Sequence, residues 1–141
     1  MLDKRVAGDR LRTIRITFEG KEVLLSAFCD TGNKLTDPFD GTPVIICEYR
    51  VVKEILPQAL QRYFADCTGI PPETGWNRKI RLVPCQTVNG SGMIPCFFPD
   101  RFQEISGDTV REHKVLIGIC QEKLSAGEYT ALFNAVLFQN S

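Results

Sequence analysis

The sequence has little of several features that mark common functional classes. It contains one histidine, His113, no C-x-x-C pair, and no cysteine at ligand spacing from that histidine. Zinc sites need such clusters, so we expect no metal and no cofactor. Its 17 basic residues balance its 17 acidic residues. Without a positive excess or a basic stripe, we expect no nucleic-acid partner.

Long apolar segments are also missing. No apolar run approaches the roughly 20 residues that a membrane helix needs, and no signal peptide opens the chain. We therefore expect this stretch to be soluble as it stands. A length of 141 residues suits one domain with a real core, so we expect residues 1–141 to form a single domain.

Six cysteines are present, and their setting favours free thiols over disulfides. Four of them lie inside apolar stretches, where a thiol behaves as a small hydrophobe: Cys29, Cys47, Cys96 and Cys120. This use of cysteine fits a reducing, cytosolic setting better than a secreted one.

Hydrophobic periodicity predicts a mostly β fold with one or two helices. Alternating or β-branched runs predict strands at 11–18, 22–29, 43–47, from residue 80, at 93–98 and at 114–118. Polar stretches predict loops at 68–77 and 104–113. Many short strands with close turns favour a closed or sandwiched sheet.

Two segments change to helical spacing. Residues 51–64 have apolar side chains mostly at helical intervals, and Pro57 is expected to break that helix. Residues 126–137 are predicted to be an apolar helix, capped by Ser125 with Glu128 in the capping-box position.

The main chemical signal is Asp30-Thr31-Gly32, at the end of the second predicted strand. A lone D-T-G is often a strand-end turn in which the aspartate caps backbone amides. The order of the surrounding segments indicates more. A glycine-tipped hairpin follows at Asn89-Gly90-Ser91-Gly92, then the hydrophobic-hydrophobic-Gly strand Leu116-Ile117-Gly118 and the predicted helix. This order is that of aspartic peptidases, with the hairpin in the place of the flap.

Such a motif has a clear chemical logic. Two neighbouring carboxylates cannot both ionise comfortably, so they share one proton and act as base and acid in the same step. Thr31 can anchor the loop through its hydroxyl, and Gly32 permits close backbone approach. The chain has no second D-[TS]-G, because Asp66-Cys67-Thr68-Gly69 contains an extra residue. A two-fold homodimer would supply the partner of Asp30.

Alternative interpretations stay open. A cysteine protease would use Cys67 or Cys85 with His113, but no fixed partner for that histidine is evident. A domain that keeps the fold without cleaving would serve as a dimerising or partner-binding module. Asp37 and Asp40 are interpreted as turn residues. Arg81 is either a surface charge or a contact of the site.

The D-T-G belongs to a longer series of blocks. In chain order these are Asp30-Thr31-Gly32-Asn33-x-Leu35-x-Asp37-Pro38, Gly41-x-Pro43-Val44-Ile45-Ile46, Arg81-Leu82-Val83-Pro84, Gly92-Met93-Ile94-Pro95-Cys96-Phe97-x-Pro99-Asp100, and Ile117-Gly118 with Leu124-Ser125 and Tyr129-x-Ala131-Leu132. Over most of residues 11–138, this series resembles the sporulation sigma-E factor processing peptidases of spore-forming bacteria. Cys85 and Cys96 depart from it, since small residues without a thiol are expected there.

The resemblance implies a retropepsin-like acid-protease fold with one lobe per chain, and a homodimeric aspartic protease with Asp30 catalytic and Thr31, Gly32 and Asn33 in the active-site loop. It implies an inactive sigma-factor precursor as substrate, from which an N-terminal pro-segment is removed, and activation by a signalling protein from the neighbouring compartment. Family members carry N-terminal membrane helices that this chain lacks. The full-length protein would therefore lie at the cytoplasmic face of the cell membrane.

Overall fold

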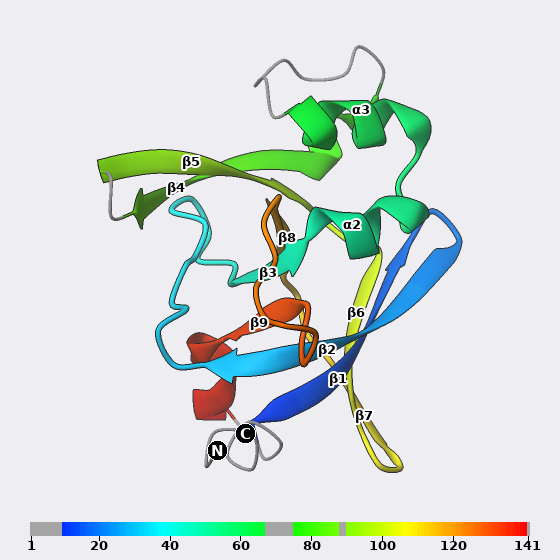
Figure 1. Cartoon of the computed structure of the whole chain (residues 1–141), viewed down its shortest axis with the longest axis vertical. Coiled ribbons are helices and arrows are strands. Elements are labelled where there is room, and N and C mark those ends of the chain that lie inside the picture. The colour runs from blue at the N-terminus through cyan, green and yellow to red at the C-terminus, as the bar shows by residue number, and fades with distance from the viewer. Residues whose placement is uncertain (1–9, 67–74, 88–89, 141) are drawn as a thin grey trace.

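A computed structural model of the chain describes residues 10–66, 75–87 and 90–140, and within them β-strands dominate. The strands are β1 Leu11–Phe18, β2 Lys21–Asp30, β3 Val44–Glu48, β4 Ile80–Thr87, β5 Gly90–Phe97, β6 Arg101–Ser106, β7 Thr109–Glu112, β8 Leu116–Cys120 and β9 Ala131–Asn134. The helical segments are α2 Tyr49–Val52, η1 Lys53–Ile55, α3 Gln58–Asp66, η2 Trp76–Lys79 and η3 Ala135–Asn140, the η segments being 3₁₀ helices. The mostly β prediction is confirmed (Figure 1).

The β1–β2 hairpin follows directly from the sequence. Alternation in β1 puts Ile14, Ile16 and Phe18 on one face, and all three are fully buried. The turn needs positive φ at both central positions, and Glu19 and Gly20 have φ values of 50° and 82°. The strands therefore pair in the register Phe18↔Lys21 to Leu11↔Phe28.

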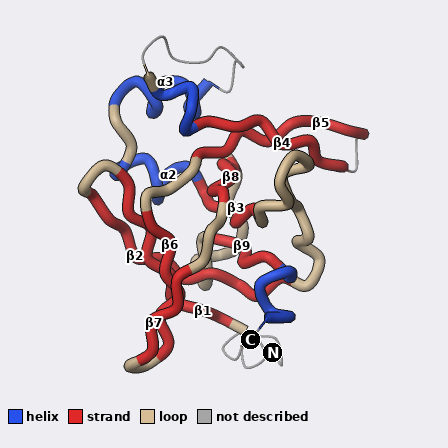
Figure 2. Tube along the Cα trace, turned by 180° about the vertical axis from the view of Figure 1, so that it is seen from behind, coloured by secondary structure: helices blue, strands red, loops and turns tan. Residues whose placement is uncertain are grey.

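The predicted helical region at 51–64 is confirmed, with its break where Pro57 stands. The 3₁₀ helix η1 ends at Ile55, and α3 begins at Gln58. Phe64 of α3 lies 5.9 Å from Phe97 of β5, ring centre to ring centre, and Phe97 lies 5.2 Å from Phe18. Both views show α3 beside the base of the β4–β5 hairpin (Figures 1 and 2). These aromatic contacts fix that base to the core.

The expectation of a closed or sandwiched sheet is wrong. One sheet runs in the order β4-β5-β8-β3-β9-β2-β1-β6-β7, so β4 and β7 are its edges among the described strands. Both edges carry residues that discourage further pairing. Pro84 in β4 has no N–H to donate, and β7 is exposed throughout and carries the charged side chains of Arg111 and Glu112.

The predicted loop at 104–113 is also wrong, because β6 and β7 form a hairpin there. Gly107 supplies positive φ at its turn, and β6 pairs with β1. Polar composition concealed this hairpin, since all four residues of β7 face solvent. Of the predicted loop at 68–77, residues 68–74 lie outside the described residues, and Trp76 opens η2.

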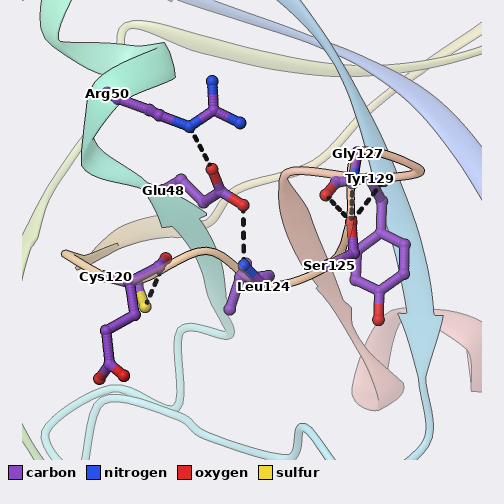
Figure 3. Close-up of polar contacts among 8 residues, drawn as sticks. Glu48, Arg50, Cys120, Leu124, Ser125, Gly127 and Tyr129 are labelled. Atoms are coloured by element: carbon purple, nitrogen blue, oxygen red, sulfur yellow. Dashed lines mark hydrogen bonds and ion pairs between the residues drawn. The ribbon is translucent and has the colours of Figure 1, made fainter.

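The predicted helix at 126–137 is replaced by a loop, β9 and η3. The Ser125 hydroxyl accepts hydrogen bonds from the backbone N–H groups of Gly127 and Tyr129 at 3.2 and 3.0 Å, and donates to Tyr129 O at 2.6 Å (Figure 3). Gly127 has a φ of 118°, which a helix excludes. Ser125 therefore closes a tight loop instead of capping a helix. Short polar side chains often form such local hydrogen bonds to the backbone in place of helical ones.

Buried Glu48 directs the chain into β9. One carboxylate oxygen accepts a hydrogen bond from Leu124 N at 2.8 Å, and the other lies 2.8 Å from Arg50 Nε (Figure 3). The backbone N–H of Glu48 also donates to Thr130 O at 3.0 Å. These contacts hold the returning loop at the end of β3, so that β9 enters between β3 and β2.

Gly118 allows β8 to pack closely against β3 and β5. A Cβ built there would lie 2.8 Å from Val44 Cγ1 and 3.0 Å from Ile94 Cδ1. We expect Gly118→Ala to lower the free energy of unfolding by about 1–3 kcal/mol, because the added methyl group overpacks against the fully buried Val44. Denaturant titration measures this. Gly92→Ala on β5 is the control, since a Cβ there meets nothing within 4 Å; equal losses in both variants would contradict the packing argument.

Candidate active site

Asp30 ends β2 and is half-buried. Its Oδ1 accepts a hydrogen bond from Gly32 N at 2.9 Å, and its backbone oxygen accepts one from Asn33 N at 3.0 Å. A Cβ on Gly32 would stand 3.2 Å from that Oδ1, so glycine keeps the surroundings of the carboxylate open. Thr31 is exposed beside it. The D-T-G thus forms a tight turn that presents Asp30 at the end of a core strand.

Two buried asparagines connect this turn to the sheet. Asn33 Nδ2 donates to Val44 O at 3.1 Å and to Leu132 O at 3.2 Å. Asn134 Nδ2 donates to Leu35 O at 2.7 Å and to Val44 O at 3.0 Å, and its Oδ1 accepts from Val136 N at 2.9 Å. Because a buried amide is costly without partners, these bonds specify a single position for the loop.

Strand β9, and not β8, lies beside the D-T-G strand. Leu116-Ile117-Gly118 forms β8 as a buried strand, but β8 pairs with β3 and β5, and no helix follows it in residues 121–130. Instead β9 runs parallel to β2 with Asn134 in register with Asp30, and η3 follows directly. Asn134 is a site residue that was not predicted from the sequence. Its signal is an amide that ends the apolar run Ala131-Leu132-Phe133.

The β4–β5 hairpin projects over the loop that follows Asp30 (Figures 1 and 2). Together they form a cleft of about 510 Å³. The hairpin contributes Cys85, Gln86 and Ile94, and the other wall consists of Asp30, Gly32, Asn33, Lys34, Leu35 and Ile46. The structure therefore brings the candidate carboxylate and the candidate flap hairpin to one cleft.

The predicted tip residues are placed only in part. Asn89 lies outside the described residues, whereas Gly90, Ser91 and Gly92 are exposed on β5. None of these three residues lines the cleft, but Ser91 and Gly92 pair with Gln86 and Cys85, which do. Gly90 has a φ of 118°, in the region that favours glycine.

The loop aspartates adopt the turn geometry expected for them. Asp37 Oδ1 accepts a hydrogen bond from Phe39 N at 2.9 Å. Asp40 Oδ1 accepts hydrogen bonds from the Thr42 hydroxyl at 2.8 Å and from Thr42 N at 3.0 Å, and these bonds lower the pKa of Asp40 below its ordinary value.

The structure does not bring His113 to the described cysteine candidate. Cys85 lines the cleft from β4, at one edge of the sheet, while His113 follows β7 at the opposite edge. Its Nε2 lies 3.0 Å from Glu104 Oε1, and its ring packs edge-on against Phe133. Cys67 lies outside the described residues.

Three other cysteines are core residues of the described structure: Cys29, Cys47 and Cys96 are buried. Burial raises the pKa of Cys96 to about 12 and raises that of Cys47 well above its ordinary range, so both stay protonated at neutral pH.

Within the described parts of the chain, no group of three or more His, Cys, Asp or Glu side chains could hold a metal ion. No described helix is long and apolar enough to span a membrane.

A second hollow, of about 170 Å³, lies on the other side of the D-T-G turn. Its lining consists of Arg10, Arg12, Cys29, Thr31 and Phe138. The start of β1 and the 3₁₀ helix η3 therefore meet next to Thr31. This face combines the exposed part of the turn with charged and aromatic side chains.

Replacing Asn134 tests the connection between the loop and the sheet. We expect Asn134→Leu to lower the free energy of unfolding by about 2–3 kcal/mol, since Leu35 O and Val44 O each lose one hydrogen bond and the backbone N–H of Val136 loses its acceptor. Urea unfolding measures the change. Gln58→Leu, at an exposed position of α3, is the matched control and is expected to stay within about 0.5 kcal/mol. A similar small effect at Asn134 would mean that its amide does not hold the loop.

Comparison with known proteins places the chain in a family. The family model described as sporulation factor SpoIIGA, peptidase family U4, matches residues 1–137. A Bacillus thuringiensis subsp. kurstaki protein whose name describes a sporulation sigma factor-processing peptidase is 34% identical over 135 residues, which cover 91% of this chain and 84% of that protein. No solved structure matches the chain.

Two further relatives are longer than this chain. The sporulation sigma-E factor-processing peptidase of Priestia megaterium is 30% identical over 130 residues, covering 86% of this chain and 42% of its own length. A Clostridium acetobutylicum protein named for the same activity is 28% identical over 134 residues, which cover 94% of this chain and 44% of that protein. The chain thus spans less than half of these two relatives. With a family match over nearly its whole length, the chain belongs to the sporulation factor SpoIIGA family of peptidases.

Proposed function

We propose that the chain is the protease domain of an aspartic endopeptidase that works as a homodimer, with Asp30 as one of two catalytic carboxylates. The position of Asp30 carries the proposal: it ends a core strand in a D-T-G turn and lines a cleft beneath a β-hairpin. A peptide in that cleft would lie between the carboxylate and the hairpin.

The arrangement of strands supports a retropepsin-like lobe. Such a lobe needs an apolar strand that ends in D-T-G, a flap hairpin, and an apolar strand next to the D-T-G that leads into a helix. Here β2, the β4–β5 hairpin, and β9 with η3 supply these parts. In this proposal Leu132-Phe133-Asn134 takes the place first expected for Leu116-Ile117-Gly118.

The chemistry requires a second carboxylate beside Asp30. In a shared-proton pair, the ionised carboxylate removes a proton from water as the water oxygen attacks the peptide carbonyl carbon. The protonated carboxyl then supplies the proton that ends on the leaving nitrogen. No metal or cofactor enters this reaction. Since the pair titrates as a unit, its two apparent pKa values belong to both aspartates together.

A second copy of the chain is the proposed source of that carboxylate. Two-fold symmetry would place Asp30 against its counterpart and oppose the two exposed Thr31 residues. The hollow beside Thr31, with Arg10, Arg12 and Phe138, lies on the face that would meet the partner. We expect a weak dimer from this domain alone.

The substrate follows from the names of the relatives. The Priestia megaterium relative is named for sigma-E factor processing, and we extend this to the present chain. The proposed reaction removes the N-terminal pro-segment of an inactive sigma-factor precursor. We also propose that an activating signalling protein controls it, and that segments of the longer relatives beyond this domain hold the full-length form at the cytoplasmic face of the membrane.

Substituting Asp30 tests the reaction. We expect Asp30→Ala to abolish shortening of the sigma-factor precursor when both are co-expressed with the candidate activator, because the dyad loses a carboxylate. Gel mobility and mass spectrometry of the precursor measure the product. Asp108→Ala, an exposed aspartate in the β6–β7 turn, is the matched control and should retain full cleavage.

The outcomes separate the alternatives. Cleavage that survives Asp30→Ala would exclude the aspartic mechanism, and loss of cleavage in Cys85→Ser would favour a thiol nucleophile instead. If neither the unmodified chain nor its variants cleave, the domain is a dimerising or partner-binding module, or it acts on a different substrate. Dimerisation measured by sedimentation should be equal in the unmodified chain and Asp30→Ala.

Mixing the two forms tests the shared site. Adding an equal amount of the Asp30→Ala chain at a concentration that makes all chains dimeric should reduce cleavage by the unmodified chain to about half, because mixed dimers hold one carboxylate. Cleavage rates after subunit exchange measure the effect. An unchanged rate would show that each chain acts alone, and Asp108→Ala added in the same amount controls for substrate competition.

A further inference from the structure

Asp37 fixes the far end of the loop that forms one wall of the cleft. Its side chain is fully buried. Its Oδ1 accepts from Phe39 N, its backbone N–H donates to Thr42 O at 2.9 Å, and its backbone oxygen accepts from Gly41 N at 2.7 Å. Leu35, two residues earlier, lines the cleft. The position of Asp37 is therefore coupled to that wall.

Arg81 reaches this carboxylate from the hairpin. Its guanidinium forms an ion pair with Asp37 Oδ2. The same group lies over two rings, with Cζ 5.0 Å from the ring centre of Phe98 and 5.9 Å from that of Phe39. Only 33% of the Arg81 side chain is exposed. A guanidinium so paired and stacked is restricted in position, unlike a solvated surface charge.

The pair joins the two walls of the cleft through the edge strand of the hairpin. In the hairpin, β5 is secured by β8 through the pairs Cys96↔Gly118 and Phe97↔Ile117. Strand β4 is the edge of the sheet, with β5 as its neighbour. Arg81 precedes Cys85 by four residues in β4, so both side chains point to the same face of the hairpin.

We propose that Arg81 and Asp37 are a positioning pair that sets the height of the β4–β5 hairpin above Asp30. The pair touches neither the reacting atoms nor the cleft. It acts by holding β4 to the loop, and thereby determines how closely the hairpin lies over a bound peptide. This inference rests on the proposed proteolytic function, because that function makes the cleft a substrate site.

The test separates position from stability. Arg81→Met leaves a buried carboxylate without its partner, so it destabilises the fold as well as releasing the hairpin. The double variant Asp37→Asn with Arg81→Met removes both charges and is expected to regain most of the lost stability. Its kcat/KM for precursor cleavage should nevertheless stay about tenfold to a hundredfold below that of the unmodified chain, because the hairpin is misplaced.

Hydrogen exchange is measured alongside cleavage, with two further variants. Hydrogen exchange of β4 and β5 amides should accelerate in the double variant, while exchange in β1 and β2 is unchanged. Arg81→Lys keeps the charge but loses the planar stacking, and is expected to give intermediate rates. Arg101→Met is the matched control, since its ion pair with Glu112 is more than half exposed and lies at the β6–β7 hairpin.

The outcomes distinguish the two hypotheses. A double variant with unchanged kcat/KM and unchanged hairpin exchange would overturn the positioning role and leave a purely structural ion pair. Cleavage that does not depend on Asp30 would overturn the proposed protease mechanism instead. In that case hydrogen exchange alone decides whether the pair holds the hairpin.

Discussion

The arrangement of this domain depends on amide groups that are buried at the junction of three strands. Asn33 and Asn134 each donate to the backbone of the neighbouring segments, and their shared acceptor is Val44 O, at the start of β3. Val44 is fully buried, so this carbonyl has little access to solvent. Removing the amides would take both of these donors from it, and this cost forces the loop after Asp30, β3 and β9 into one relative arrangement.

Close packing and hydrogen bonds position different walls of the cleft. Close contact at Gly118 sets the distance between β8, β3 and β5, and it determines where the second strand of the hairpin lies. The loop wall is instead positioned by directed hydrogen bonds, from Asn33 at one end and Asp37 at the other. Shape thus fixes one wall and hydrogen-bond geometry fixes the other.

Local signals made part of the structure predictable. Alternation revealed β1, turn chemistry revealed its hairpin, and Pro57 marked the break before α3. The errors came from interactions between distant residues. Ser125 and Gly127 override the helical spacing of residues 126–137, and solvent exposure of β7 conceals its pairing. Asn134 could not be assigned beside Asp30 because only the tertiary fold determines which apolar strand enters between β2 and β3.

The hydrogen bonds of the two asparagines also bear on the order in which the site forms. Asn33 and Leu132, like Leu35 and Asn134, are 99 positions apart in the chain. Contacts of such separation form late, since the intervening chain must first be ordered. During synthesis, the turn that carries Asp30 leaves the ribosome long before β9 does. A growing chain therefore holds the D-T-G sequence without its geometry, and the site is completed only when the last strand docks.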